Sequence, residues 1–557
     1  MNDLKGTADM FSNSLSRVRE YLQSHGAAYT ARRLGQKAAQ QLLGTYERRR
    51  KQERTSAEEL RAQRENQPDA GLISVVVPVY NTDPGMLTAL LDSLEAQTYL
   101  NFEAVLYDGA GTRAETAETL KVRGEKDPRF RVIRGEANKG ISGNTNEAVK
   151  LARGEYIALC DHDDLLSPDA LWRVADCIVK KHPDMVYSDE DRITQGGKKH
   201  MDPHYKPDYC PDSLVSDNYI CHLTVIRKDV LEAVGGLRGG FDGSQDHDLF
   251  LRITEKTTRI EHIPFILYSW REVFSSKSHT QFYTCLENGC RAAVEHEARM
   301  GRKAEAVPVN KEIRLWYEVP AEASVEALVH GDSEEECREC LGELDFRTDW
   351  PKLTGSILIA PEEERVSLIN EAARTSRADY LLVLDARVTE MNRYFIREML
   401  MYAQRDDVAG VTGVLADRKK RITHGGFALG MTHAVQCINE GLYVSAGGWH
   451  DMMNKAHNVS AVSLCCLMVK RTNWLDLDEG YRGGLAAADL GLRQRQAGKW
   501  FVFTPHAQAQ LAPCALLLSG NERNAEDAAR FESKWGKDLT DPCYSSRFDR
   551  RKANYRF

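Results

Sequence analysis

The chain has 557 residues, long enough for two or three domains, and its 42% hydrophobic and 28% charged residues are typical of a soluble globular protein. The net charge of -8 argues against a general nucleic-acid binder. No apolar run approaches the roughly 18–20 residues that span a bilayer, and the first residues do not open a signal peptide. The thirteen cysteines are odd in number and scattered, which predicts reduced thiols and a cytoplasmic location rather than a disulfide framework.

Residues 1–70 are polar and rich in Arg, Gln, Glu and Ala, with almost no strand formers. We expect one or two helices here, ending in a charged linker at residues 65–70. Residues 46–54 are locally basic. Such a run fits peripheral contact with an anionic membrane face or, as the simpler interpretation, the solvated face of a helix.

From Gly71 onwards, β-branched runs alternate with segments of helical periodicity. They predict, in chain order, strand 73–79, helix 84–96, strand 102–107, strand 131–134, helix 144–152 and strand 156–160. Strands that alternate with helices predict an α/β fold, with a mainly parallel sheet covered on both faces.

Three carboxylates follow the last of these strands directly: Asp161, Asp163 and Asp164. Carboxylates gathered at one strand end repel each other unless a cation neutralises them, and Mg²⁺ and Mn²⁺ prefer carboxylate oxygens. Ligands of open α/β sheets bind at the carboxyl ends of strands. The pattern therefore predicts a metal site, with a solvated acidic turn as the alternative.

The chain also contains an internal repeat. Residues 146–161 resemble residues 370–385, and residues 245–252 resemble residues 486–493 at a broadly similar spacing. We expect a duplicated domain, with the first copy over 71–307, the second over 312–545 and a tail at 546–557.

The repeat acts as an internal control on the candidate chemistry. Asp163 of the first copy corresponds to Arg387 of the second, and Asp246 corresponds to Ala487, whereas Asp248 persists as Asp489. The framework is kept while the residues suited to metal and proton chemistry are lost together. This favours one active copy and one retired copy, and it favours a structural role for Asp248.

Seven motifs of the first copy occur together and in a fixed order. They are Val77-Pro-Val-Tyr-Asn81, Gln97-Thr-Tyr99, Asn138-Lys-Gly140, Gly154-Glu-Tyr156, Asp161-His-Asp-Asp164, Tyr187-Ser-Asp-Glu-Asp191 and Gly243-Ser-Gln-Asp246. With them the first copy resembles a family 2 glycosyltransferase of the GT-A fold, and within that family the bacterial rhamnosyltransferase-like and O-antigen or cell-wall polysaccharide enzymes. The second copy resembles the tandem domain of the same group through His424-Gly-Gly426, Asn458-Val-Ser-Ala-Val462 and Cys465-Cys-Leu-Met468. The resemblance implies a Rossmann-like GT-A domain, then a degenerate GT-A-like domain, with a helical N-terminal extension.

The resemblance also implies roles for single residues. Asp161 and Asp163 would hold Mn²⁺ or Mg²⁺ against the donor diphosphate, with Asp164 in support. Asp246 would be the general base that takes the proton of the acceptor hydroxyl. The alternative for Asp246 is a capping carboxylate ahead of a helix at 249–254.

The remaining implied roles divide between the two substrates. The residues expected at the nucleotide-sugar donor are Pro78, Tyr80, Asn81, Asp108, Asn138, Lys139, Gly140 and Asn144. Those expected at the acceptor are Asp189, Asp191, His222, Gln245, Trp270 and Arg271. The chain departs from the family at Gly109, where an acid turned towards uracil is usual. It departs again at Ser269, where relatives commonly carry His, so that water or another residue such as His279 would have to replace a ligand.

The expected function is inverting, metal-dependent transfer of a sugar from a nucleoside-diphosphate donor to a lipid-linked saccharide or polysaccharide in bacterial cell-surface polysaccharide synthesis. We expect the protein in the cytoplasm, peripherally at the inner membrane face. Two alternatives stay open: a metal-dependent phosphohydrolase of nucleotide sugars, and a non-catalytic glycan-binding scaffold. The second copy would grip the glycan, dock a partner such as another glycosyltransferase, or form a homodimer.

Overall fold

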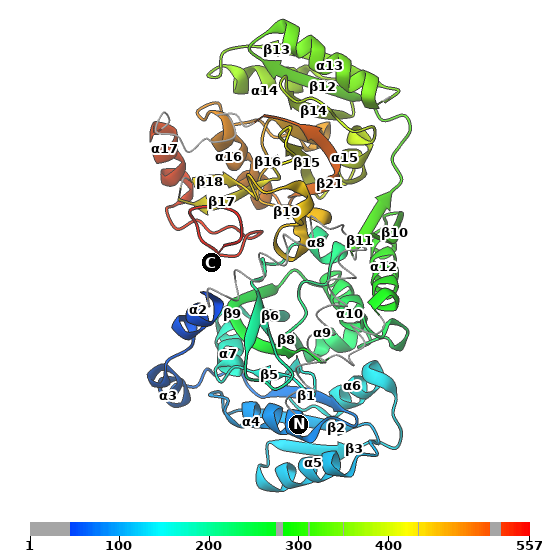
Figure 1. Cartoon of the computed structure of the whole chain (residues 1–557), viewed down its shortest axis with the longest axis vertical. Coiled ribbons are helices and arrows are strands. Elements are labelled where there is room, and N and C mark those ends of the chain that lie inside the picture. Colours follow the sequence, from blue (N-terminus) through cyan, green and yellow to red (C-terminus); the bar gives the residue numbers. More distant parts are fainter. Residues whose placement is uncertain are drawn as a thin grey trace, which may run out of the picture.

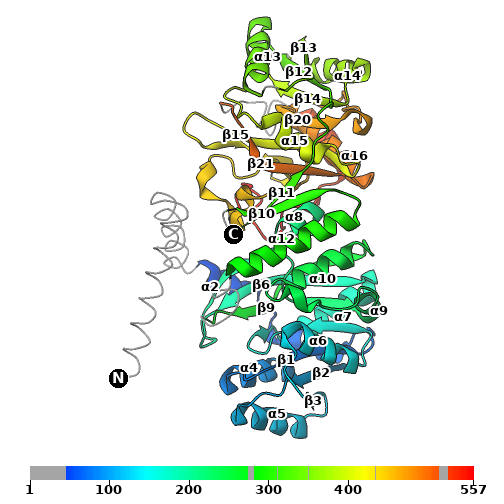
Figure 2. The same ribbon diagram turned by 90° about the vertical axis from the view of Figure 1, so that its right-hand side faces the viewer.

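The structure is a computed structural model that describes residues 45–273, 282–309, 312–348, 350–432, 434–512 and 525–556. Figure 1 shows an elongated molecule with two α/β units stacked along its long axis, the N-terminal unit below and the C-terminal unit above. A long helix, α12, and the two-stranded ladder of β10 and β11 lie between them (Figure 2).

The first sheet has the strand order β3-β2-β1-β4-β8-β6-β9-β5, with β7 paired to β6. Strands β1 to β4 run parallel, β8 is antiparallel to both of its neighbours, and β6 and β9 are parallel again. The strands are β1 (Ile73–Val79), β2 (Phe102–Asp108), β3 (Phe130–Arg134), β4 (Tyr156–Leu159), β5 (Leu165–Leu166), β6 (Met185–Ile193), β7 (His200–His204), β8 (Thr224–Arg227) and β9 (Ile260–Arg271). The α/β class predicted from the sequence is confirmed.

Helices precede, cover and follow this sheet. They are α2 (Thr45–Glu53), α3 (Ala57–Glu65), α4 (Pro84–Glu95), α5 (Ala114–Lys126), α6 (Gly140–Leu151), α7 (Ala170–Lys181), α8 (Pro211–Ser216), α9 (Lys228–Ala233), α10 (Gln245–Thr254) and α12 (Phe282–Arg299), with a 3-10 turn at Gly239–Phe241. Every residue of β1 is buried, as expected for a β-branched strand covered on both faces.

Two helices begin earlier than their apolar periodicity predicts. Helix α6 begins at Gly140, which has a φ of 74° and donates its N–H to Asn138 Oδ1 at 3.0 Å. Helix α10 begins at Gln245, so Asp246 lies in its first turn, where a carboxylate is favoured by the helix dipole. The prediction of a helix at 249–254 with Asp246 ahead of it was wrong, because polar first-turn residues carry no hydrophobic period.

The second sheet has the order β13-β12-β14-β20-β15-β21-β19, with β16 paired to β15. Its strands are β12 (Val325–Gly331), β13 (Leu353–Ile359), β14 (Tyr380–Asp385), β15 (Val408–Ala416), β16 (Ile422–His424), β19 (His457–Val459), β20 (Cys466–Lys470) and β21 (Trp500–Gln510). The other strands of this half are β10 (Ala304–Val309), β11 (Glu312–Tyr317), β17 (Phe427–Met431) and β18 (Ala434–Cys437). The helices are α13 (Glu334–Thr348), α14 (Arg365–Thr375), α15 (Phe395–Ala403), α16 (Gly483–Gln496) and α17 (Ala525–Trp535), with 3-10 turns at Val444–Ala446, Trp449–Asn454 and Arg471–Asn473.

The two sheets share one topology. The order β2-β1-β4-β8-β6-β9 matches β13-β12-β14-β20-β15-β21, and each matched pair of neighbours has the same parallel or antiparallel sense. Within the described residues, the second sheet has no counterpart of β3. A shared strand order with shared directions is what duplication of one domain produces.

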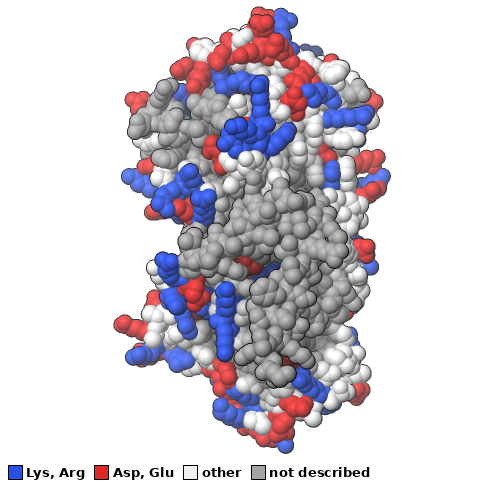
Figure 3. All heavy atoms as spheres, viewed as in Figure 1, with Lys and Arg blue, Asp and Glu red and all other residues white. Residues whose placement is uncertain are grey.

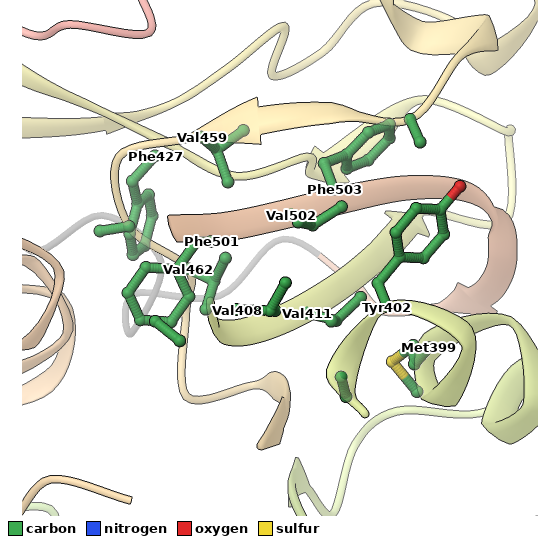
Figure 4. Packing of buried hydrophobic residues seen from close by; sticks show 14 of the residues in the cluster. Met399, Tyr402, Val408, Val411, Phe427, Val459, Val462, Phe501, Val502 and Phe503 are labelled. Atoms are coloured by element: carbon green, nitrogen blue, oxygen red, sulfur yellow. The ribbon is translucent and has the colours of Figure 1, made fainter. Parts of the chain in front are cut away.

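Apolar residues fill the interior of the second unit. Figure 4 shows Phe501, Val502 and Phe503 of β21 beside Val408 and Val411 of β15. The buried hydrophobic cluster that contains them continues into the first unit, where it includes residues of β6, β8 and α10. The two units are therefore joined through a continuous core.

Helix α8 anchors the first unit in the second. Its Asp212 carboxylate forms a buried ion pair with Arg405, which follows α15. Asn458, in β19, receives the Asp212 backbone N–H at 2.8 Å and donates its amide to the Asp212 carboxylate at 2.8 Å. The short helix is thus held at its N-terminal end by charge and hydrogen bonds from the other unit.

The N-terminal helix α2 lies beside the C-terminal tail and the first sheet (Figure 1). Tyr46 donates its hydroxyl to Asp191 at 2.5 Å, Arg49 donates to the Arg547 carbonyl, and Glu53 pairs with Arg547 at 2.7 Å. Part of the predicted basic face therefore turns inward. The helices expected over residues 1–44 lie outside the described residues.

The described surface carries both signs of charge. On the face in Figure 3, Lys and Arg side chains are interspersed with Asp and Glu. Among the described residues, no helix combines the length and apolar character that a membrane span requires.

Replacing Arg405 by Met strands the buried Asp212 carboxylate without its cation. We expect the free energy of unfolding to fall by about 3–5 kcal/mol, measured by denaturant titration. The control is Lys470→Met, which removes the pair with the exposed Asp406 and should cost less than about 1 kcal/mol. A loss for Arg405→Met no larger than that of the control would contradict the anchoring role.

Candidate active site

The acidic loop after β4 is held in place by β9. Asp164 is fully buried, and its carboxylate accepts the Tyr268 hydroxyl and the Arg271 backbone N–H, each at 2.6 Å. The Arg271 guanidinium donates to the backbone carbonyl of Asp163. These bonds fix the position of Asp164 and with it the loop. The sequence alone did not identify Tyr268 as the partner of Asp164.

Two further groups gather beside Asp164. The Tyr268 oxygen accepts the Asp161 backbone N–H at 3.1 Å, and the His222 ring stacks on the Tyr268 ring with centroids 4.7 Å apart. His222 Nε2 lies 3.8 Å from Asp161 Oδ2. Among the described residues, Asp161, Asp164 and His222 form the group that could hold a metal ion, with ligand atoms within 4.8 Å of one another.

The site is electrostatically strained without a cation. Burial, followed by repulsion from Asp163 and Asp161, raises the pKa of Asp164 well above its usual range. Burial also raises the pKa of Asp163, against the attraction of His162. Asp163 lies outside the group of three, so its predicted place among the first ligands differs from the arrangement that the structure shows.

The donor set fits a divalent ion. It offers two carboxylates and one imidazole, and the raised acid pKa values are what a nearby positive charge would relieve. Carboxylates suit both Mg²⁺ and Mn²⁺, whereas an imidazole suits the transition metal better. The residues therefore fit Mn²⁺ better than Mg²⁺.

Asp246 is linked to this group through the segment that carries His222. It is half-buried in the first turn of α10, and its Oδ2 accepts the Asn218 amide at 3.1 Å. Asn218 and His222 belong to one segment, residues 217–222, between α8 and β8. Gln245, next to Asp246, accepts the Gly243 backbone N–H with its side-chain Oε1 at 2.6 Å.

Asp248 differs from Asp246. It is fully buried and pairs with Arg238 and Arg252. Its second-copy counterpart Asp489 is also buried and pairs with Arg493, again four residues later. The shared ion pair gives both aspartates a structural role.

The predicted donor residues lie in two places, at the carboxyl ends of β1 and β2 and at the start of α6. Tyr80 is 43% exposed directly after β1, and Pro78 is buried within that strand. Asn81 accepts the backbone N–H groups of Thr112 and Arg113. Asp108 pairs with Arg134 at 2.5 Å and accepts the Gly111 N–H at 2.8 Å, so it also braces the loop that follows β2.

The departure at Gly109 has a local cause. A Cβ added there would lie 2.5 Å from the amide nitrogen of Asn144. That amide donates to Asn138 at 2.9 Å, and its oxygen accepts the Lys139 N–H at 3.1 Å. Asn144 thus orders the turn before α6, and a side chain at position 109 would have to displace the Asn144 amide. The Lys139 ammonium pairs with Glu147 at 3.1 Å.

The acceptor role predicted for Asp189 and Asp191 needs correction, because both are fully buried. Asp189 accepts the Lys206 N–H and the His262 ring, each at 2.8 Å. Asp191 is surrounded by Tyr46, Ser269 and His200. These partners come from distant parts of the chain, which is why local sequence suggested an exposed acidic cluster.

Glu190 stands between Asp189 and Asp191 in β6, and its side chain points to the opposite face of the sheet. It accepts the His222 N–H at 3.1 Å and lies 3.5 Å from the buried Lys206 ammonium. Burial alone would raise its pKa, but Lys206 and His204 lower the pKa of Glu190 to about 2. It is therefore a permanent anion beside the His222 backbone.

The acceptor role predicted for Arg271 also needs correction, whereas that of the partly buried Trp270 stays a prediction. Arg271 is buried, and its guanidinium donates to the Asp163 carbonyl of the acidic loop and to the Gln195 carbonyl at 2.9 Å. Trp270 packs against the hydrophobic core, with the Arg192 guanidinium 4.8 Å above its ring. Ser269 bonds to Asp191, and His279 lies outside the described residues.

Comparison with known proteins decides the family. Residues 74–235 match the model of glycosyl transferase family 2. The chain carries a family 2 glycosyltransferase domain. This confirms the resemblance and the fold class predicted from the sequence, and we refer below to the first unit, which contains the matched residues, as the transferase domain.

Two curated relatives cover most of this chain. An uncharacterized protein, y4gI, of Sinorhizobium fredii is 33% identical over 85% of this chain and 57% of its own length. The O-antigen biosynthesis protein RfbC of Myxococcus xanthus is 30% identical over 82% of this chain and 38% of its own. The chain thus spans about half or less of the length of these relatives. A solved structure, S. aureus TarS in complex with UDP-GlcNAc, is 20% identical over 40% of this chain and 66% of that chain, with a TM-score of 0.34.

In the second unit, an internal ion pair stands at the loop that matches the acidic loop of the transferase domain. Arg387, which stands where Asp163 stands, chelates Asp385 with two guanidinium bonds of 2.8 and 2.7 Å. Burial would raise the pKa of Asp385, but Arg387 lowers it. The arginine thus balances the charge of Asp385 within the loop.

Strand register extends this comparison to His222. Leu159 of β4 pairs with Thr224, and the equivalent Val383 of β14 pairs with Leu467, which matches His222 to Cys465. The imidazole is therefore lost together with Asp163 and Asp246. This coincidence was the signal that could have moved His222 from the acceptor group to the metal group.

Binding of Mn²⁺ should raise the Tm of the protein more at higher pH. Without metal, the raised pKa values of Asp163 and Asp164 favour the folded state at low pH, and that contribution is lost as the pH rises through them. Mn²⁺ needs the ionised carboxylates, so its stabilisation should grow from about pH 5 to about pH 8 in thermal melts. The same shift at every pH would contradict this site.

Substitution should also separate the two candidate ligand sets. We expect His222→Ala to weaken Mn²⁺ binding by at least about tenfold, and Asp163→Asn to weaken it less, in calorimetric titrations. His200→Ala, which removes an imidazole bonded to Asp191, is the control and should leave affinity unchanged. Equal losses for Asp163→Asn and His222→Ala would restore the sequence-based ligand set.

Proposed function

We propose that this protein is an inverting, metal-dependent glycosyltransferase that moves a sugar from a nucleoside-diphosphate donor to a saccharide acceptor in bacterial cell-surface polysaccharide synthesis. One observation carries the proposal. The segment 217–222 brings His222 to the acids at the end of β4 and, through Asn218, holds Asp246. The same segment therefore positions both a candidate metal ligand, His222, and the candidate base, Asp246.

The proposed reaction is a single displacement. Asp246 accepts the proton of an acceptor hydroxyl as that oxygen attacks the anomeric carbon, and the bond from this carbon to the donor diphosphate breaks. When bound, a divalent ion supplies positive charge that neutralises the leaving diphosphate. Asp161, Asp164 and His222 would hold it, and Tyr268 and Arg271 keep the acidic loop in place.

The donor side is proposed to lie against Tyr80, Asn81 and Asp108, at the carboxyl ends of β1 and β2. Helix α6 begins at Gly140, after Asn138 and Lys139, and the positive end of its dipole there would favour a phosphate. Position 109 is Gly and carries no acid that could face a uracil ring, so the proposal does not include a uridine donor.

The proposed acceptor rests on a named relative, and the proposed location rests on helix α2. The name of the M. xanthus relative supports a polysaccharide or lipid-linked saccharide acceptor. We propose that the protein works in the cytoplasm at the inner membrane face, where Arg48 and Lys51 on the exposed side of α2 would meet anionic lipid.

Asp246→Asn should abolish the base without disturbing the metal group. We expect transfer to fall about 10²–10⁴-fold, while Mn²⁺ affinity and donor KM stay unchanged. Product formation from a panel of nucleotide sugars, with and without saccharide acceptors, measures it. Asp229→Asn, an exposed acid on α9, is the control. Rapid acceptor-independent turnover by the wild-type protein would instead identify a phosphohydrolase.

A further inference from the structure

The loop segment 217–222 is held by side chains from other parts of the molecule. Its later part is held within the transferase domain, because the buried Lys206 ammonium donates to the carbonyls of Ile220 and His222. Its first residue, Asp217, contacts the second unit: the Lys455 ammonium is hydrogen-bonded to the Asp217 carboxylate. The next residue, Asn218, donates to Asp246.

Lys455 is built into this contact. Its side chain is 5% exposed, and besides Asp217 it pairs with Glu312 of β11 at 3.3 Å. It precedes β19, whose Asn458 binds the opposite end of α8. Both ends of α8 are thus held by one short stretch of the second unit, residues 455–458.

A second contact reaches the same segment from the same region. His450 stacks on His204 with centroids 4.1 Å apart, and His204 lies 3.5 Å from Glu190, which accepts the His222 N–H. His450 has a φ of 46°, a conformation that a non-glycine residue adopts only where its surroundings hold it. The second unit therefore contacts the first residue of segment 217–222 directly and reaches its last residue through His204 and Glu190.

From these contacts we propose that Lys455 of the retired copy is a positioning residue for the active copy. It fixes Asp217, and through the adjacent Asn218 it sets the orientation of the Asp246 carboxylate. The second unit kept this function after losing its own acids. The inference rests on the proposed role of Asp246 as the base.

The test uses the full chain and a double variant, Lys455→Met with Glu312→Gln. The second change prevents Glu312 from being left as a buried charge, and Asp217, whose side chain is 36% exposed, can still reach water. We expect hydrogen exchange of the amides in 217–223 to become about tenfold faster, with exchange in β4 and the acidic loop unchanged. We expect kcat to fall about tenfold, with donor KM and Mn²⁺ affinity unchanged.

The control is Lys534→Met, which removes a pair with the buried Asp489 inside the second unit. It should leave exchange at 217–223 and kcat as in the wild type. Faster exchange spread evenly over both units, or an unchanged kcat in the double variant, would overturn the proposal. If the wild-type protein transfers no sugar, the proposed function fails, and exchange at 217–223 alone then decides whether Lys455 fixes the segment.

Discussion

The arrangement of the site depends on burying one carboxylate, Asp164. A buried acid must have its lone pairs satisfied, and β9 supplies both donors, the Tyr268 hydroxyl and the Arg271 N–H. Because Tyr268 also receives the Asp161 N–H and carries the His222 ring, the same contact aligns all three members of the metal group. The acids can therefore stay close together despite their mutual repulsion.

The second unit shows which parts of this design belong to folding and which to chemistry. Both copies keep the strand order, the buried strand before the acids and the ion pair of Asp248 or Asp489. In the second copy, Arg387 balances Asp385 within the loop itself. A guanidinium is always charged, so this loop folds without a bound ion.

Much of the fold could be predicted from the sequence, because its signals are local. The strand from Ile73 to Val79 and the acids after β4 were found from hydrophobic runs and their ends. The positions of His222, Asp189 and Asp191 depend on partners from distant elements, such as Tyr268, His262 and Tyr46. No pattern within a window of sequence encodes such contacts, so a buried acid and an exposed one look alike.

The way α8 is lodged in the second unit has a consequence for how such a protein can change. Cutting the chain between the units would expose a charged helix end and part of a shared apolar core, so the transferase domain is not a separable module. Mutational drift in the second unit is then less constrained at the Asp385 loop than at the surface that holds α8. A duplicated domain can in this way become indispensable through its fit to its neighbour, whatever its own chemistry.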